Sequence, residues 1–291
     1  MRSRALLLVF AVACTPRREE PVVHTTSAEA PLCGGCHEDA AGSWRQSMHH
    51  ASFTNEDFQA AFHDEPLAFC ANCHAPHGKE RGVDCASCHR PGTEHTTRAD
   101  DSVCKGCHEF STPKRPALLQ STFSEHGSDT GCIDCHMKRD GAHRDHRFTV
   151  SRDPGFLGRA IALSDLERTR DGVTVSIAKQ GVGHRFPTGD VFRALFVRAW
   201  VETDDGRIAS VAEASLHRDW DAFRSREPET NDTRLGEEPA KLTLALPPTI
   251  EGGRVRIQVD YQRGATARAG ALALFSSLRI ADWTRPLPRV K

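Results

Sequence analysis

Apolar and polar residues alternate most clearly in the C-terminal half of this 291-residue chain. Leu242, Leu244 and Leu246 are each separated by a single residue. The same period runs through 254–261, where Val, Ile and Tyr alternate with Arg, Gln and Asp. A period of two is typical of strands that bury one face. The pattern therefore predicts two half-buried strands.

A hairpin is predicted in the same half of the chain. Asp205-Gly206, a strong two-residue turn signal, separates two apolar segments. With a further strand expected over 173–179, these segments predict an all-β, sandwich-like domain of six or seven strands over 151–291. The stretch 161–168 has an apolar spacing that favours a short helix instead.

Residues 31–150 have the opposite character. Leu, Ile, Val and Phe account for only 15 of these 120 positions, which is below the roughly 20% that a chain needs to bury a core of its own. Either this segment is disordered, or a non-protein group fills its core. Frequent Gly and Pro predict mainly short α-helices and loops for this segment.

Five copies of the pentapeptide Cys-x-x-Cys-His contain ten of the 11 cysteines. Each is typical of a c-type haem attachment site, in which two thiols bind the porphyrin and the histidine binds iron. Zinc or disulfides would explain the thiols, but not a histidine after every second cysteine. We therefore predict five covalently bound haem c groups with iron, which make 31–150 a haem-rich domain of short α-helices and loops. The cofactor-binding cysteines are Cys33, Cys36, Cys70, Cys73, Cys85, Cys88, Cys104, Cys107, Cys132 and Cys135, and the iron-binding histidines are His37, His74, His89, His108 and His136.

The N-terminus predicts export. Two arginines precede an apolar run over 5–12, which is typical of a signal peptide over 1–13. The residues that lead into Cys14 resemble a bacterial lipoprotein cleavage site, so Cys14 is expected to carry lipid, and the polar segment 14–30 to act as a tether. An ordinary secretory signal is the alternative. The predicted location is periplasm-facing, or the outer membrane as a lipoprotein.

Histidine is expected to supply most of the sixth iron ligands, because only Met48 and Met137 lie beyond the signal peptide. Iron with two histidine ligands has a lower potential than iron with a Met/His pair, and it has no open position for a substrate. This favours electron transfer over catalysis. The candidate histidines are His49, His50, His63, His77, His95, His126, His143, His146 and His184.

The order and spacing of motifs over 31–150 resemble the multihaem cytochrome c family (tetrahaem cytochrome c of hydroxylamine oxidation, or cytochrome c-prime type). The resemblance is carried by Trp44-x-x-Ser47-x-His49, by a Cys-x-x-Cys-His followed by Pro-Gly-x-x-His95, and by a Cys-x-x-Cys-His-Met that ends at Met137. Arg90 and Lys138 depart from the family, which usually has Gly and Pro there. The resemblance implies that the distal ligands include His49, His95, His126 and His146.

Some of these assignments stay open, since His50 adjoins His49 and His143 lies close to His146. The segment 183–189, Gly-His-Arg-Phe-Pro-Thr-Gly, resembles a Gly-His-x-x-Pro-Thr-Gly segment of the C-terminal β domain in such cytochromes. Its glycines would let the backbone approach a flat ring closely. His184 is therefore the expected fifth distal ligand, and the alternatives are His77 and His63.

The charges, 38 Lys and Arg against 39 Asp and Glu, argue against a basic nucleic-acid binder. The sequence thus predicts an exported pentahaem cytochrome that carries electrons between donor and acceptor proteins, with a lipid anchor in the membrane and no nucleic-acid partner. No catalytic residue is assigned. The alternative is a multihaem reductase or oxidase of a small nitrogen or sulfur compound at one five-coordinate haem.

Overall fold

The computed structural model describes residues 30–64, 66–89, 99–111, 117–127, 131–141, 143–148, 152–220, 229–268 and 271–290. Its described helices are short, and none of them is both long and apolar enough to cross a membrane. They are α1 (Ala30–Cys36), α2 (Glu38–Arg45), α3 (Glu56–Asp64), the 3-10 helix η1 (Ala68–Cys70), α4 (Ala71–His74), α5 (Cys85–Cys88), α6 (Ser102–His108), α7 (Thr122–Glu125), α8 (Cys132–His136) and α9 (Pro154–Gly158).

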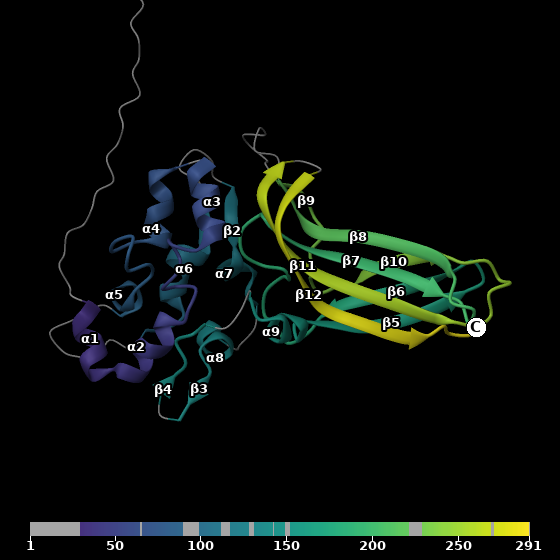
Figure 1. Ribbon diagram of the computed structural model, residues 1–291, viewed down its shortest axis with the longest axis horizontal. Coiled ribbons are helices and arrows are strands. Elements are labelled where there is room, and N and C mark those ends of the chain that lie inside the picture. Colours follow the sequence, from purple (N-terminus) through teal and green to yellow (C-terminus); the bar gives the residue numbers. More distant parts are fainter. Residues whose placement is uncertain are drawn as a thin grey trace, which may run out of the picture.

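Strands form four antiparallel sheets (Figure 1). The two large sheets have the orders β10-β6-β5 and β12-β11-β7-β8-β9, and the pairs β1-β2 and β3-β4 form two small sheets. The strands are β1 (Glu109–Ser111), β2 (Leu118–Ser121), β3 (Arg139–Asp140), β4 (His143–Arg144), β5 (Ile161–Thr169), β6 (Gly172–Lys179), β7 (Arg193–Glu202), β8 (Ile208–Trp220), β9 (Glu229–Asp232), β10 (Ala240–Ala245), β11 (Arg254–Arg268) and β12 (Ala271–Pro286).

The apolar core lies between the two large sheets. It joins residues such as Val175 of β6, Leu195 of β7 and Ile257 of β11, all fully buried. The predicted alternation is confirmed on β10, where Leu242 and Leu244 are buried between exposed neighbours. This burial supplies the main driving force for folding of residues 152–290, which we call the β part.

Residues 30–148, called here the helical part, bury very few apolar side chains. In the described stretches of this part, the buried apolar residues are Ala41, Phe53 and Ala75. Three side chains, two of them a single methyl group, do not amount to a hydrophobic core. The shortage of apolar residues noted in the sequence is thus also a feature of the fold.

The predicted fold class, mainly short helices followed by an all-β domain, is wrong for the chain as a whole. The described residues are 24% helical and 39% strand, and the expected all-β domain agrees only in part. Strands also occur in the helical part, where β1 and β2 pair after α6, and β3 and β4 pair after α8. The motif-based prediction assigned only helices and loops there, and it underestimated the β part, whose strands reach 16 residues.

The stretch 161–168, predicted as a helix, is strand β5. Leu163 and Leu166 are three residues apart, a helical spacing, yet both pack against the core. The register shifts between Leu163 and Asp165, and this bulge inserts one extra residue. The bulge returns Leu166 to the same face as Leu163, so a bulged strand imitates helical periodicity. The hairpin expected at Asp205-Gly206, in contrast, is confirmed between β7 and β8.

Polar contacts join the two parts of the chain, and Figure 1 shows the helical part at one end of the large sheets. Asp57 of α3 accepts hydrogen bonds from Arg263 of β11 at 2.7 Å and from Arg152 at 2.8 Å. Arg218 of β8 donates to the backbone carbonyls of Leu118 and Leu119 at 2.8 and 3.0 Å. The β part therefore holds the segments that carry the pentapeptides.

Candidate functional site

None of the ten pentapeptide cysteines is bound in a disulfide within the described part of the chain. Four of the five motifs lie wholly or partly on the helices η1–α4, α5, α6 and α8, and the first begins on α1. Residues three apart on a helix share a face, so the two thiols of one motif can reach one flat group, with the histidine next to it. The local geometry therefore suits attachment of a porphyrin at each motif.

Thiols of different motifs lie close together. Cys73 of the second motif donates a hydrogen bond to Cys107 of the fourth, which lowers the pKa of Cys107 to about 7. The same hydrogen bond, followed by burial, raises the pKa of Cys73. Hydrogen bonds also join the first motif to the third and the fourth to the fifth, through the pairs Cys33–Cys85 and Cys104–Cys132. The motifs thus pack against one another instead of lying separately along the chain.

Three motif histidines each face a second histidine. The ring centres are 6.2 Å apart for His108 and His49, 6.3 Å for His89 and His146, and 6.4 Å for His136 and His184. With a metal–nitrogen bond of about 2 Å on each side, the centres of two axial imidazoles lie roughly 6 Å apart. The three pairs therefore have the spacing of two ligands on opposite sides of one iron.

Backbone carbonyls orient several of these rings. Nδ1 of His146 lies 2.8 Å from the carbonyl oxygen of Arg144, and Nδ1 of His184 lies 2.8 Å from that of Arg185. In the fourth motif, by contrast, the side-chain amide nitrogen of Gln120 donates to Nδ1 of His108 at 2.9 Å. In His146 and His184, a donor hydrogen on Nδ1 leaves Nε2 unprotonated, and Nε2 is then the atom available to a metal.

Burial lowers the pKa of several of the paired imidazoles. Together with the charges that His108 and His136 could carry, it lowers the pKa of His49 to about 4. The pKa of His136 also falls to about 4, through burial first and then through His184, His108 and His126. Only a neutral imidazole binds a metal. Buried Nδ1 of His136 has no hydrogen-bond partner within the described part of the chain.

The remaining two motif histidines lie in other surroundings. His37 is exposed just after α1. The ring of His74 stacks on Phe58 at 4.0 Å, and its Nδ1 lies 2.9 Å from the carbonyl oxygen of Ser52. Among the described residues, no histidine ring faces either of them as in the three pairs.

The structure describes only one of the two remaining predicted distal ligands. His126 lies 6.4 Å from His184, with the two rings tilted by 52°, and His95 falls in 90–98, outside the described residues. The alternative candidates have other neighbours. His50 packs edge-on against Trp44 at 4.4 Å, His77 hydrogen-bonds Asp84 at 2.8 Å, and His63 and His143 are exposed.

Sequence reasoning missed two residues that shape the site. Phe148 lies edge-on to His49 at 4.3 Å and perpendicular to His146 at 6.1 Å, so it separates two of the pairs. A signal was present, because His-Arg-Phe occurs twice, at 146–148 and 184–186. Buried Asp84 caps α5, accepting a hydrogen bond from the backbone of Ser87.

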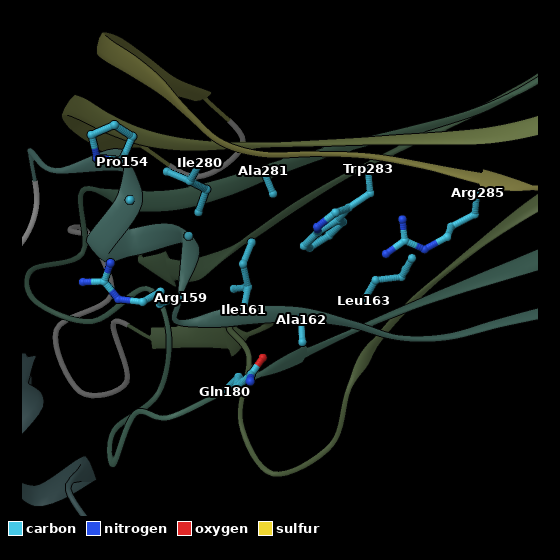
Figure 2. A pocket seen from close by; sticks show the side chains of 12 residues that line it. Pro154, Arg159, Ile161, Ala162, Leu163, Gln180, Ile280, Ala281, Trp283 and Arg285 are labelled. Carbon is cyan, nitrogen blue, oxygen red and sulfur yellow. The ribbon is translucent and has the colours of Figure 1, made fainter.

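A separate groove of about 480 Å³ lies between β5 and β12, beside α9 (Figure 2). Trp283, Leu163 and Ile280 form its apolar wall, and Arg159 and Arg285 add positive charge. Neither histidine nor cysteine lines this groove, so it is not part of the thiol and histidine cluster.

No known family model matches the sequence, and no curated protein does. The fold, however, is similar to a solved structure, that of a penta-heme cytochrome c552 from Thermochromatium tepidum. The two chains are 17% identical, with a TM-score of 0.71 over 89% of this chain and 98% of the other. At this identity the likeness establishes the fold alone.

Proposed function

We propose that the chain is a pentahaem c-type cytochrome that transfers electrons. The observation that carries the proposal is the set of three histidine pairs, each joining a motif histidine to a second neutral imidazole at 6.2–6.4 Å. Two cysteines that are not in a disulfide beside every motif histidine, and the near-absence of buried apolar side chains in the described helical part, agree with it. The fold shared with a penta-heme cytochrome supports the same reading.

In this proposal each motif holds one haem c through its two cysteines and binds the iron through its histidine. The distal ligand to the iron of His108 is His49, that of His89 is His146, and that of His136 is His184. His95 and His126 remain the ligands proposed for the other irons. The bound haems supply one-electron exchange between ferric and ferrous iron.

The chain's own residues then determine what the haems can do. Imidazoles on both sides close the iron to substrates and favour low potentials. Contacts between the motifs, such as Cys73 with Cys107, bring attachment sites from distant parts of the sequence together. Both properties suit transfer of single electrons along a connected set of haems.

The cellular setting is also part of the proposal. Residues 1–29, with the predicted signal peptide and lipid anchor at Cys14, lie outside the described residues. We place the protein on the periplasmic side or in the outer membrane as a lipoprotein, where it exchanges electrons with donor and acceptor proteins. Such redox contacts are typically small, below about 1,200 Å².

The test is production of the full chain in a host that attaches haem c. Mass spectrometry should show five haems, and replacing both cysteines of one motif by serine should leave four. The spectrum of the oxidised protein should be low-spin. A colourless product of bare polypeptide mass would refute the proposal, and a high-spin haem that shifts with nitrite, hydroxylamine or sulfite would favour the enzyme.

A further inference from the structure

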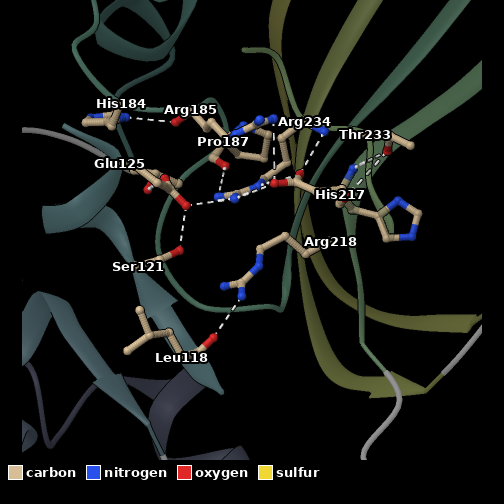
Figure 3. Close-up of polar contacts among 12 residues, drawn as sticks. Leu118, Ser121, Glu125, His184, Arg185, Pro187, His217, Arg218, Thr233 and Arg234 are labelled. Carbon is tan, nitrogen blue, oxygen red and sulfur yellow. Dashed lines mark hydrogen bonds and ion pairs between the residues drawn. The ribbon is translucent and has the colours of Figure 1, made fainter. Parts of the chain in front are cut away.

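A buried ion pair joins the two parts of the chain next to His184. The side chain of Arg234, which follows β9, is only 4% exposed, and that of Glu125 at the end of α7 is 10% exposed. Arg234 donates to Glu125 Oε1 at 2.7 Å and to Asp232 at 2.8 and 2.9 Å (Figure 3). Burying charges in this way costs free energy unless each charge has partners. Here Arg234 has two carboxylate partners, Glu125 across the junction and Asp232 within the β part.

Glu125 uses both carboxylate oxygens. Ser121 donates to Oε1 at 2.6 Å, and Thr188 donates to Oε2 at 2.9 Å. Thr188 belongs to the segment 183–189 that contains His184, and its hydroxyl also lies 2.9 Å from that of Thr122. The carboxylate is therefore the point where α7, β9 and the His184 segment meet.

The same segment is held along its length. Gly127 donates its backbone N–H to the carbonyl oxygen of Gly183 at 3.0 Å. Phe186 exchanges two backbone hydrogen bonds with Leu235, at 2.8 and 2.9 Å. Arg234 also donates to the carbonyl oxygen of Pro187 at 3.4 Å. Contacts on both sides of His184 thus fix the backbone that carries it.

The ring of His184 itself has few restraints. Within the described part of the chain, its Nδ1 contacts the carbonyl oxygen of Arg185 alone, and Arg185 belongs to the same segment. Yet the ring lies nearly parallel to that of His136, with an angle of 9° between the planes. Since His136 belongs to the helical part and His184 to the β part, this alignment depends on how the two parts are joined.

We infer that Arg234 and Glu125 are positioning residues that hold His184 opposite His136, so that the β part supplies a ligand to the fifth haem. This inference rests on the proposed function. Arg234 ties the segment to Glu125, and Glu125 ties it to the helix that precedes His126. Loss of either side chain lets the segment move, and His184 leaves the iron.

The test uses the matured five-haem protein with Arg234→Gln. The expected result is conversion of one haem of the five to high-spin in the oxidised spectrum, with the haem count unchanged. Added imidazole should restore the low-spin spectrum, because a free ligand can replace a displaced side chain. Arg234→Lys, which keeps the positive charge near Glu125, should retain more low-spin iron than Arg234→Gln.

Arg218→Gln is the matched control. Arg218 is equally buried and also crosses the junction, but it donates to the backbone of Leu118 and Leu119 on β2. It should weaken the junction without opening the fifth haem. If Arg234→Gln fails to accumulate, Thr188→Val removes the hydroxyl that meets Glu125 at little change in volume, and it should also produce one high-spin haem.

The outcomes separate the two claims. A parent protein without haem refutes the proposed function. If the parent has five low-spin haems and its Arg234→Gln or Thr188→Val variant also has five low-spin haems, only the positioning role is overturned. A high-spin haem in the Arg218→Gln control to the same extent would also overturn it, since the effect would then follow from any weakening of the junction.

Discussion

His49 lies opposite His108, with ring centres 6.2 Å apart, although the two residues belong to segments that are well separated in the sequence. The neighbouring His50 turns the other way and packs on Trp44 at 4.4 Å. The backbone thus presents adjacent histidines to different surroundings, and this difference can be tested.

In the proposed cytochrome we expect His49→Ala to convert one haem of the matured protein to high-spin, because the iron held by His108 would lose its second imidazole. The measurement is the magnetic resonance spectrum of the oxidised protein. His50→Ala is the matched control and should leave every haem low-spin. The reverse result, with only His50→Ala changing the spectrum, would contradict the assignment.

His146→Met should raise the midpoint potential of one haem, because a Met/His pair favours ferrous iron more than two histidines do. A shift on the order of 100 mV is expected, within the roughly 0.8 V that axial ligands control. A spectroelectrochemical titration measures it. His143→Met, at an exposed position three residues earlier, should leave the titration unchanged.

Asp84→Ala should lower the free energy of unfolding by about 1 kcal/mol through loss of the α5 cap. Burial alone would raise the pKa of Asp84, but hydrogen bonds from His77 and Ser87 and the charge of Arg81 outweigh burial and lower it. The stabilisation by the ionised group is therefore present above its unfolded pKa of about 3.9. It is lost as the pH falls through the lower folded pKa.

Urea unfolding of the parent and of Asp84→Ala at pH 7 and near pH 3 measures this difference. The gap between the two proteins should be largest at pH 7 and should narrow in acid. A gap that widens in acid would contradict the stated direction of the shift.

Asp57→Ala should weaken the junction by about 1–3 kcal/mol, because it leaves the half-buried guanidinium group of Arg263 and the exposed one of Arg152 without their shared partner. Thermal unfolding and the rate of proteolysis between the two parts are the measurements. Glu213→Gln serves as the control, since its ion pair with Arg198 is exposed and should have no measurable effect. Equal losses in both variants would argue against a special role for Asp57.

Sequence patterns correctly predicted the structural features that depend on residues close together in the sequence. The alternation at Leu242 and Leu244 and the turn at Asp205-Gly206 determine strands and a hairpin by local geometry, and both are present. The bulge that follows Leu163 depends on how β5 pairs with β6, and the residues of 161–168 alone do not indicate this pairing. The helix expected there was wrong for that reason.

In the candidate site, too, local sequence determined some features and tertiary packing determined the others. Thiol and histidine positions within each pentapeptide follow from the repeat itself, whereas the facing histidines come from elsewhere in the chain. The choice between His49 and His50 depends on where Trp44 and Phe148 pack. The meeting of Glu125 with Arg234 depends on how the two parts join, and neither residue carries a sequence signal of this role.

The scarcity of buried apolar side chains in the helical part has a consequence for biosynthesis. In the proposed cytochrome, a newly exported chain could fold its β part around its own valines and leucines, whereas residues 30–148 would need bound haem to complete their core. Cellular haem supply would then set how much of the product survives the proteases of the envelope. Abundance of the intact protein would act as a gauge of cofactor delivery, independent of any change in its transcription.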